Sequence, residues 1–446
     1  MSFFHSEQEK LNQICQYLRN GFTPRAQWAI GIELEHLLVD ASTMKRVFYN
    51  GERGVEEVLQ RLLAELSATP IYEKDALLGM STREFELSIE PGGQFEISLA
   101  KESSLLTLRD HYFRALTQIH HVLDPMRLTL LPIGLDPWNT IEEIPLIPKE
   151  RYHIMDQTMG NLSEAARAMM RQTCALQISI DVENEKDWIR KFRVLFALSP
   201  ILYTLFDSVA LQNGSSPEKY NVRQEIWRKT DPVRTGVVPG IFRPDFSLED
   251  YAKWLLTIPV LFLPDDDGIH HEERSFSLSE ALEEAKTAAQ ADDFIMHGIS
   301  VTFPDVRYKQ FLEVRMMDSL PDPWAFAAAA MLRGLFYDDN VFAALEALFT
   351  PFQSEWIPRG KDAGRDNGIQ GYYHSDYFVN WGLRLLKMAE RGLCEEEKDL
   401  LEPLQKLWSN LDTPRIYIEK MAKRQGWISA FASLTEGKKA CLNPNF

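Results

Sequence analysis

Hydrophobic residues recur along the chain with two different periods, which predicts helices and strands in an irregular order. Apolar residues three and four positions apart indicate helices at residues 7–20, 54–67, 105–123, 163–170 and 187–206. Alternating apolar and polar residues indicate strands at residues 28–39, 128–135, 173–182 and 310–317, and a hairpin over residues 84–99. From about residue 323 onward the pattern is mostly helical.

This order of elements disfavours a doubly wound parallel sheet, because strands and helices do not alternate regularly. We expect an α+β fold in which an antiparallel sheet is flanked by helices. We also expect residues 1–446 to form a single domain with a mostly helical C-terminal part. Two segments rich in glycine and charged residues, 212–246 and 359–368, are expected to be irregular.

Glutamates gather on one polar face in each of two predicted strand segments. Side chains at i and i+2 share a face of a strand. On the strand at 28–39 and on the hairpin, these residues are Glu33, Glu35, Glu84, Glu86, Glu90 and Glu96. Like charges that face each other across strands are destabilising by roughly 0.2–1 kcal/mol per pair, so we expect a cation there. Mg²⁺ held together with nucleotide phosphates fits this face, and a solvated polar face of the sheet is the alternative.

Two further strands carry polar residues on one face. Gln177 and Ser179 share a face of the strand at 173–182, and Glu313 and Arg315 share a face of the strand at 310–317. Each pair alone is typical of a surface contact. Together with the glutamates, they indicate a sheet whose polar side is the floor of an active site.

The irregular segment at 212–246 supplies cations that could face this floor. It contains an aromatic residue among basic ones, namely Trp227 with Arg223, Arg228, Lys229 and Arg234. The planar guanidinium of arginine matches carboxylates and phosphates with two hydrogen bonds. These residues therefore predict binding of anionic substrate groups, with solvated loop charges as the alternative. The glycine-rich stretch at 359–368 could contact phosphates, and we favour a plain loop there.

Composition narrows the function further. The chain has 48 Lys and Arg against 65 Asp and Glu, a net charge of −17, which argues against a nucleic-acid-binding surface. No apolar run reaches the roughly 20 residues of a membrane helix, and no secretory signal is readable. The four cysteines are widely spaced, which favours reduced thiols and a cytoplasmic protein. The P-loop, dinucleotide, zincin and α/β-hydrolase motifs are absent.

The ordered motifs resemble one family, the glutamate-cysteine ligases of the plant and proteobacterial type. The matching stretches are GIELEHLLVD (31–40), LSIEPGGQFEIS (87–98), ERYHIMDQTM (150–159), MMRQTCALQISID (169–181), IRKFRVLFALSPI (189–201), VRQEIWRKTDPVRTGVVP (222–239) and TFPDVRYKQFLEVRMMD (302–318). The resemblance implies a strongly curved antiparallel sheet of the glutamine-synthetase-like catalytic fold. It also implies a reaction in which ATP phosphorylates the γ-carboxylate of L-glutamate and the amine of L-cysteine displaces the phosphate.

The resemblance assigns roles to residues at the matching positions. The implied metal ligands for Mg²⁺ are Glu33, Glu35, Glu90, Glu96 and Glu313, and the implied contacts to ATP are Glu33, Glu90 and Arg315. The implied substrate contacts are Gln177, Arg223, Trp227 and Arg234, with Arg234 and Arg315 as the catalytic residues that stabilise the transferred phosphoryl group. His297 and Arg307 also lie in matching stretches, without an assigned role. The expected partners are small molecules, with no nucleic acid and no membrane, on either a monomer or a homodimer.

Two alternatives remain open at this point. The family often has Asn where this chain has Ser179, and it has small residues where this chain has Met316 and Met317. These differences allow a γ-glutamyl ligase with another amine or amino acid as acceptor. A non-catalytic nucleotide- or metabolite-binding protein on the same scaffold is the alternative from a different functional class.

Overall fold

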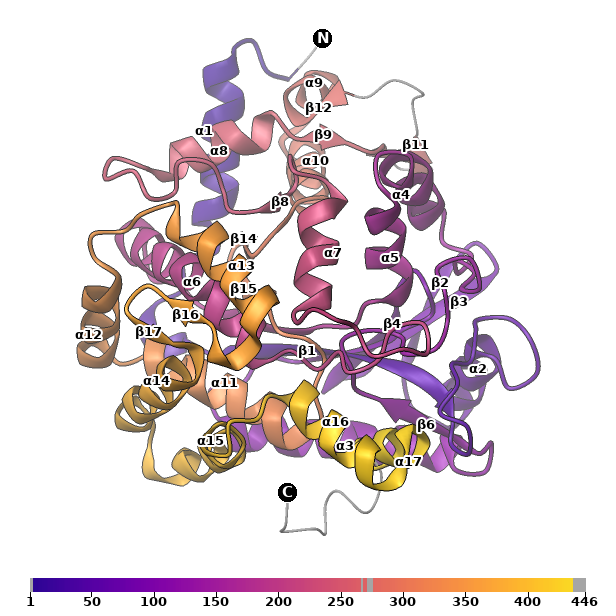
Figure 1. Ribbon diagram of the computed structural model, residues 1–446. Helices are drawn as coiled ribbons and strands as arrows, with labels where there is room; N and C mark the ends of the chain where they lie inside the picture. The colour runs from indigo at the N-terminus through magenta and orange to yellow at the C-terminus, as the bar shows by residue number, and fades with distance from the viewer. Residues whose placement is uncertain (1–2, 266–267, 271–275, 436–446) are drawn as a thin grey trace.

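An antiparallel sheet runs through the middle of the molecule, with helices on both sides (Figure 1). The computed structural model describes residues 3–265, 268–270 and 276–435. Within these residues the main sheet has 9 strands in the order β14-β15-β7-β1-β5-β4-β3-β2, and β6 pairs with β1. The strands are β1 (Ile30–Asp40), β2 (Thr69–Glu73), β3 (Ala76–Ser81), β4 (Phe85–Ile89), β5 (Phe95–Leu99), β6 (Leu128–Leu131), β7 (Leu176–Ile180), β14 (Val306–Tyr308) and β15 (Leu312–Val314).

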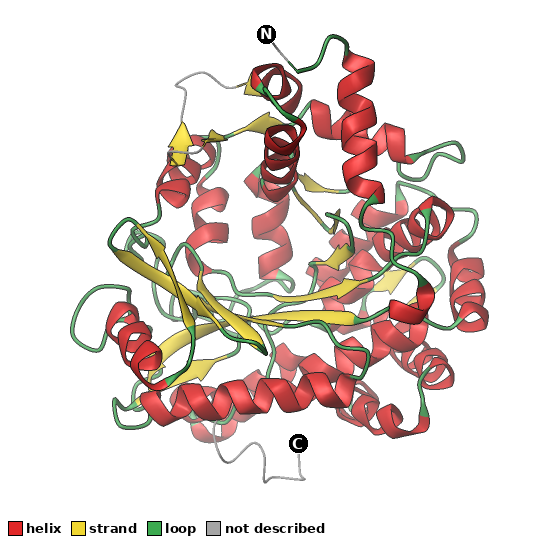
Figure 2. Cartoon of the chain, turned by 180° about the vertical axis from the view of Figure 1, so that it is seen from behind, coloured by secondary structure: helices red, strands yellow, loops and turns green. Residues whose placement is uncertain are grey.

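The helices form layers over the two faces of this sheet (Figures 1 and 2). They are α1 (Glu7–Arg19), α2 (Val55–Glu65), α3 (Leu105–Leu123), α4 (Glu150–Gly160), α5 (Glu164–Gln172), α6 (Glu185–Leu205), α7 (Val222–Thr230), α8 (Leu248–Leu256), α9 (Leu278–Glu284), α10 (Ala288–Ser300), α11 (Asp322–Phe336), α12 (Asp339–Phe349), α13 (Trp356–Asn367), α14 (Phe378–Gly392), α15 (Glu402–Ser409), α16 (Pro414–Gln425) and α17 (Trp427–Ala432). In Figure 1, α4, α5 and α7 stand above β1, and α3 and α11 lie below it.

Short strand pairs lie outside the main sheet. They are β8 (Thr235–Gly236) with β13 (Phe303–Pro304), β9 (Pro259–Val260) with β12 (Phe276–Ser277), β10 (Leu263–Asp265) with β11 (Gly268–His270), and β16 (Tyr372–Tyr373) with β17 (Asp376–Tyr377). The β8–β13 pair is parallel and leads directly into β14. It therefore ties the segment after α7 to the edge of the main sheet.

Burial follows the predicted alternation along the strands. On β1, Ile30, Ile32 and Leu34 are fully or almost fully buried, whereas Glu33 and Glu35 are half-buried. The apolar face of the sheet packs against α3 and α11. Burial of apolar surface contributes roughly 25 cal/mol per Å² to the free energy of folding, so the apolar face attaches the sheet to these helices. The polar face is then free to carry an active site.

Most predicted elements are confirmed, and the antiparallel α+β architecture is confirmed with them. The helix predicted at residues 105–123 is α3, and the hairpin predicted at 84–99 is β4–β5 with its turn at Pro91-Gly92-Gly93. Residues 212–246 are not irregular throughout, because they contain α7. The predictions also missed α4, α10 and the β2–β3 hairpin.

The loop predicted at residues 359–368 is wrong, because this stretch lies almost entirely in α13. Two of its glycines let α13 approach α6 closely. A Cβ atom at Gly364 would lie 2.1 Å from Oγ1 of Thr204, and one at Gly360 would lie 2.8 Å from Cβ of Pro200. The glycines therefore serve helix packing, which outweighs their low helix propensity. Among the described helices, none is both long enough and apolar enough to cross a membrane.

Candidate active site

The register of the sheet aligns polar side chains from different strands in two rows. Glu33 of β1 lies opposite Gln177 of β7 and Ser98 of β5, and Glu86 of β4 continues that row. The second row runs from Glu35 of β1 to Glu96 of β5 and on to Ser88 of β4, whose hydroxyl donates to Glu96. Because directly opposed residues point to the same side, the predicted polar faces of the separate strands form one continuous surface.

A cavity of about 370 Å³ lies over this surface. The sheet contributes its floor, including Glu33, Glu35, Glu86, Glu90 and Glu96. The opposite walls come from α4, α5, α7 and the strands at the sheet edge. Their cavity-lining residues include Lys149, Arg151, Tyr152, Met155, Met169, Met170, Trp227, Phe303, Arg307, Lys309 and Arg315. One side of the cavity is therefore anionic and the other is largely cationic and aromatic.

The carboxylates of the floor lie close together, and their negative charges are only partly neutralised by neighbouring cations. Burial raises the pKa of Glu35 to about 8, and repulsion from Glu90 adds to the shift. Burial, followed by repulsion from Glu33, Glu90 and Glu35, raises the pKa of Glu96 well above its ordinary value. The pKa of Glu33 is also raised, again mainly by burial. Carboxylates shifted upward in this way favour a bound proton or cation.

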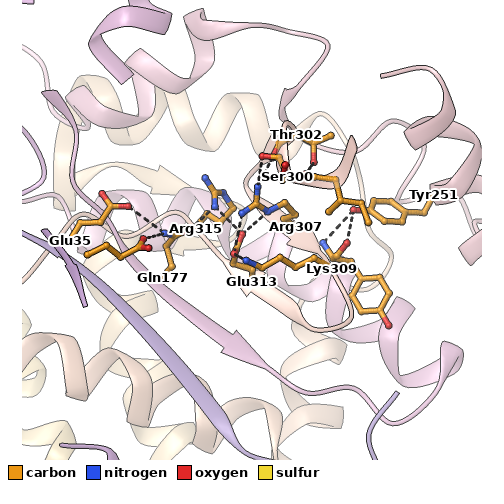
Figure 3. Close-up of polar contacts among 12 residues, drawn as sticks. Glu35, Gln177, Tyr251, Ser300, Thr302, Arg307, Lys309, Glu313 and Arg315 are labelled. Atoms are coloured by element: carbon orange, nitrogen blue, oxygen red, sulfur yellow. Dashed lines mark hydrogen bonds and ion pairs between the residues drawn. The ribbon is translucent and has the colours of Figure 1, made fainter. Parts of the chain in front are cut away.

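Glu313 has the opposite environment, because three basic side chains surround it (Figure 3). Arg307 Nε donates to it over 2.8 Å, Arg315 Nη1 over 2.9 Å, and Lys309 Nζ lies 2.7 Å away. Burial works to raise the pKa of Glu313, but these cations hold it well below the ordinary value. Arg315 also donates to Gln177 Oε1 over 2.5 Å, which joins the cationic group to the carboxylate floor.

Helix α4 contributes an arginine that the sequence analysis did not single out. Arg151 lines the cavity, and its Nη2 donates to Ser300 Oγ over 3.0 Å. Its Nε atom is buried without a hydrogen-bond partner in the described structure, and burial lowers the pKa of this guanidinium. The neighbouring Tyr152 hydroxyl donates to Glu90 over 3.2 Å. Arg151 lies in the matching stretch ERYHIM at 150–155, but the sequence alone does not show that this stretch lies near the glutamates.

The structure brings most predicted site residues to the cavity. Its lining includes the predicted residues Glu33, Glu35, Glu90, Glu96, Gln177, Trp227 and Arg315. The indole Nε1 of Trp227 is buried without a hydrogen-bond partner among the described residues. The unassigned Arg307 also lines the cavity. His297 lies buried against Phe262, and burial lowers its pKa to about 3, so its imidazole is neutral.

Three predicted residues do not line the cavity. Arg234 is buried and donates to Asp231 over 2.9 Å and to the Val301 carbonyl over 3.1 Å. Arg223 is also buried and donates to the backbone carbonyls of Arg315 and Met316. Glu313 is covered by its cations. Direct substrate or metal contacts by these residues stay predictions, and in this structure they support their neighbours.

The donor set of the floor fits magnesium in its chemistry. Mg²⁺ prefers hard oxygen ligands and is usually held by one or two carboxylates, the phosphates of a nucleotide and water. Among the described residues, no three His, Cys, Asp or Glu side chains meet closely enough to hold a metal ion alone. Burial and mutual repulsion raise the pKa values of Glu35 and Glu96, so a bound cation would stabilise their ionised carboxylates.

Comparison with known proteins decides the family. Residues 29–410 match the glutamate-cysteine ligase family 2. The chain belongs to this glutamate-cysteine ligase family. Chloroplastic glutamate-cysteine ligase B of Oryza sativa subsp. japonica is 28% identical over 388 residues, which cover 85% of this chain and 77% of that protein. The chloroplastic enzyme of Medicago truncatula is 30% identical over 390 residues, which cover 85% of this chain and 75% of that protein.

A solved structure has the same fold as this chain. The glutamate-cysteine ligase of Francisella tularensis, determined in complex with AMP, superposes with a TM-score of 0.58. The superposition covers 92% of this chain and 87% of that chain, at 12% sequence identity. At such low identity the likeness establishes the architecture, and it confirms the α+β fold expected from the sequence. The resemblance to the glutamate-cysteine ligases is confirmed by the family match itself.

Proposed function

We propose that this protein is an ATP-dependent ligase that joins the γ-carboxylate of L-glutamate to the amine of L-cysteine through a γ-glutamyl phosphate. The single observation that supports this proposal most strongly is the division of charge across the cavity, with five glutamates on the floor and arginines and lysines opposite them. Transfer of a phosphoryl group depends mainly on positioning and on neutralising charge, and this arrangement suits both needs.

The floor and the walls have separate tasks in this proposal. Carboxylates from the set Glu33, Glu35, Glu90 and Glu96 would hold Mg²⁺ one or two at a time, together with the phosphates of ATP and water, because no three of the described side chains meet closely enough to hold it alone. The bound metal would neutralise phosphate charge. On the other side, Arg315 is held by Gln177 and a buried carboxylate, so its guanidinium is fixed before substrate arrives. A fixed guanidinium stabilises charge on a transferred phosphoryl group without a reorganisation cost.

Two unpaired donors favour a carboxylate substrate near the α4 and α7 walls. Nε of Arg151 and Nε1 of Trp227 are buried without partners in the described part of the chain, and both residues line the cavity. A buried donor without a partner costs roughly 1–3 kcal/mol, which a bound carboxylate would recover. We therefore assign these two residues to glutamate binding.

The position of the unusual residues favours the cysteine acceptor over another amine. Met316 and Met317 are fully buried and do not line the cavity, so these substitutions leave its walls unchanged. Ser179 lines a separate small cavity of about 160 Å³, which shares Glu33 with the main one. Ser179 is thus the remaining motivation for a different acceptor, and it lies away from the α4 and α7 walls.

A coupled assay of ADP release tests the proposal. Release should require glutamate, cysteine and Mg²⁺ together, and mass spectrometry should detect γ-glutamylcysteine. Cysteine would be excluded as the acceptor if ADP release were undiminished without it. It would also be excluded if another amine in an amino-acid panel gave a higher kcat/KM. Nucleotide binding without any turnover would support the non-catalytic alternative.

The remaining expectations complete the proposal. We propose that the chain acts as a single catalytic domain on small molecules in the cytoplasm, as a monomer or a homodimer. The buried hydrophobic residues described form one core cluster, which supports a single domain. Cys15 and Cys174 are buried free thiols, which supports a reducing compartment. Sedimentation analysis and cell fractionation test these points.

A further inference from the structure

We propose that the buried ion pair between Lys361 and Asp305 is a positioning device that holds the cationic wall of the active site in place for ATP. This inference rests on the proposed function for its kinetic readout. It concerns two residues for which the sequence motifs assign no role. Lys361 belongs to the glycine-rich stretch at 359–368, which becomes part of α13 in the structure.

Asp305 occupies the corner between β13 and β14, behind the residues of the cationic wall. Its neighbours in sequence include Phe303 and Arg307, and both of these line the cavity. The Asp305 carbonyl accepts from the backbone N–H of Arg315 over 3.2 Å, and its own N–H donates to the carbonyl of Gly236 over 2.8 Å. One residue thus links the backbones that carry Phe303, Arg307 and Arg315.

The Asp305 side chain is anchored from two helices behind the cavity. Lys361 Nζ of α13 lies 2.6 Å from Oδ2 and 2.8 Å from Oδ1 of Asp305. The hydroxyl of Tyr203, on α6, donates to Oδ1 over 3.1 Å. Lys361 Nζ also lies 5.0 Å from the centroid of the Tyr203 ring. Oδ1 of Asp305 therefore accepts both hydrogen bonds, whereas Oδ2 has the ion-pair contact with Lys361 and no hydrogen bond among the described residues. None of the three residues lines the cavity.

The close packing of α13 explains how a lysine reaches this corner. Gly360 and Gly364 bring the helix against Pro200 and Thr204 of α6, so the Lys361 side chain extends past α6 to Asp305. A buried carboxylate that loses its only cationic partner carries an uncompensated charge and has to move or become protonated. Loss of Lys361 would therefore displace the corner and, with it, the guanidinium groups of Arg307 and Arg315.

The test compares Lys361→Met with Lys10→Met. Lys10 is a similarly buried lysine on α1 that pairs with Glu283 over 2.8 Å and does not line the active-site cavity. The side chains of Lys10 and Lys361 are 8% and 11% exposed, whereas their partners Glu283 and Asp305 are 61% and 3% exposed. Lys10→Met therefore controls for the loss of a buried lysine, without leaving a buried carboxylate unpaired. Asp305→Asn serves as a second variant if Lys361→Met does not fold, and Lys361→Arg is the conservative replacement.

We expect Lys361→Met and Asp305→Asn to lower kcat/KM for ATP by about 10- to 100-fold, because a small misplacement of catalytic groups costs that much. The KM for ATP should rise while the KM for cysteine stays unchanged, and Lys361→Arg should restore part of the loss. Simple destabilisation lowers the amount of folded enzyme and changes no KM. An unchanged KM for ATP in both variants, or an equal rise in Lys10→Met, would overturn the proposal.

Binding of a non-hydrolysable ATP analogue separates this inference from the proposed function. If the wild-type chain binds the analogue but releases no ADP with glutamate and cysteine, the proposed function fails. The role of the ion pair is then tested by calorimetry alone, in which Lys361→Met should raise the Kd for the analogue about tenfold or more. Equal affinity of the wild type and Lys361→Met would show that the pair does not position the ATP site.

Discussion

Replacing Glu96 with Gln should stabilise the free protein while damaging its function. Glu96 lies on β5, opposite Glu35 and Ser88, and repulsion from Glu33, Glu35 and Glu90 contributes to its raised pKa. The Gln side chain has nearly the same shape and can still accept from the Ser88 hydroxyl. The substitution therefore removes charge from the floor without opening a cavity.

The size of the effect follows from the neighbours. At alkaline pH, where these carboxylates are ionised, three like-charged neighbours at roughly 0.2–1 kcal/mol each predict a gain of about 0.6–3 kcal/mol in the free energy of unfolding. An unfolding entropy of about 2.1 cal/mol/K per residue means that 1 kcal/mol shifts the Tm of so long a chain by about 1 °C. We expect the Tm of metal-free Glu96→Gln at this pH to rise by about 1–3 °C above that of the wild type.

Calorimetry with and without Mg²⁺ and a non-hydrolysable ATP analogue measures both consequences. The ligands should raise the Tm of the wild type and raise that of Glu96→Gln much less, and turnover should fall by at least about 10- to 100-fold. Glu84→Gln is the matched control on the same hairpin, because Glu84 pairs with Arg114 over 2.9 Å and does not line the cavity. A lower Tm for Glu96→Gln with a full response to the ligands would refute the reasoning.

Three more predictions test other parts of the site. The pKa of Glu35, raised from 4.5 to about 8, means that its contribution to stability is present below about pH 4.5 and is lost as the pH rises through 8. In the metal-free protein, Glu35→Gln should therefore flatten the decline of the urea midpoint over that range, and an unchanged slope would contradict this assignment. Arg315→Gln should lower kcat by about 100-fold, measured by ADP release, since it removes a fixed phosphoryl contact, and it should also lower the Tm, because the buried Glu313 loses one of its three cationic partners. Gly364→Ala should lower the free energy of unfolding by about 1–3 kcal/mol in urea titrations, because its Cβ would lie 2.1 Å from Oγ1 of Thr204; wild-type stability would show that α13 can shift.

The carboxylate floor could be predicted from the sequence alone. Alternation along β1 places Glu33 and Glu35 on one face, and the turn at residues 91–93 sets the register that returns Glu96 opposite Ser88. These relations are local, because a strand has a period of two and a short turn leaves little freedom of register. The antiparallel architecture followed from the same patterns.

Only the tertiary structure decided which cations face the carboxylates. Arg223 and Arg234 were expected at the cavity, but they bind buried neighbours, whereas Arg151 and Lys309 line it. The glycine-rich stretch became a packed helix whose lysine reaches Asp305. Which long side chain meets which anion depends on how helices distant in sequence pack together. That packing depends on the shape of the whole core, which a local pattern of residues does not specify.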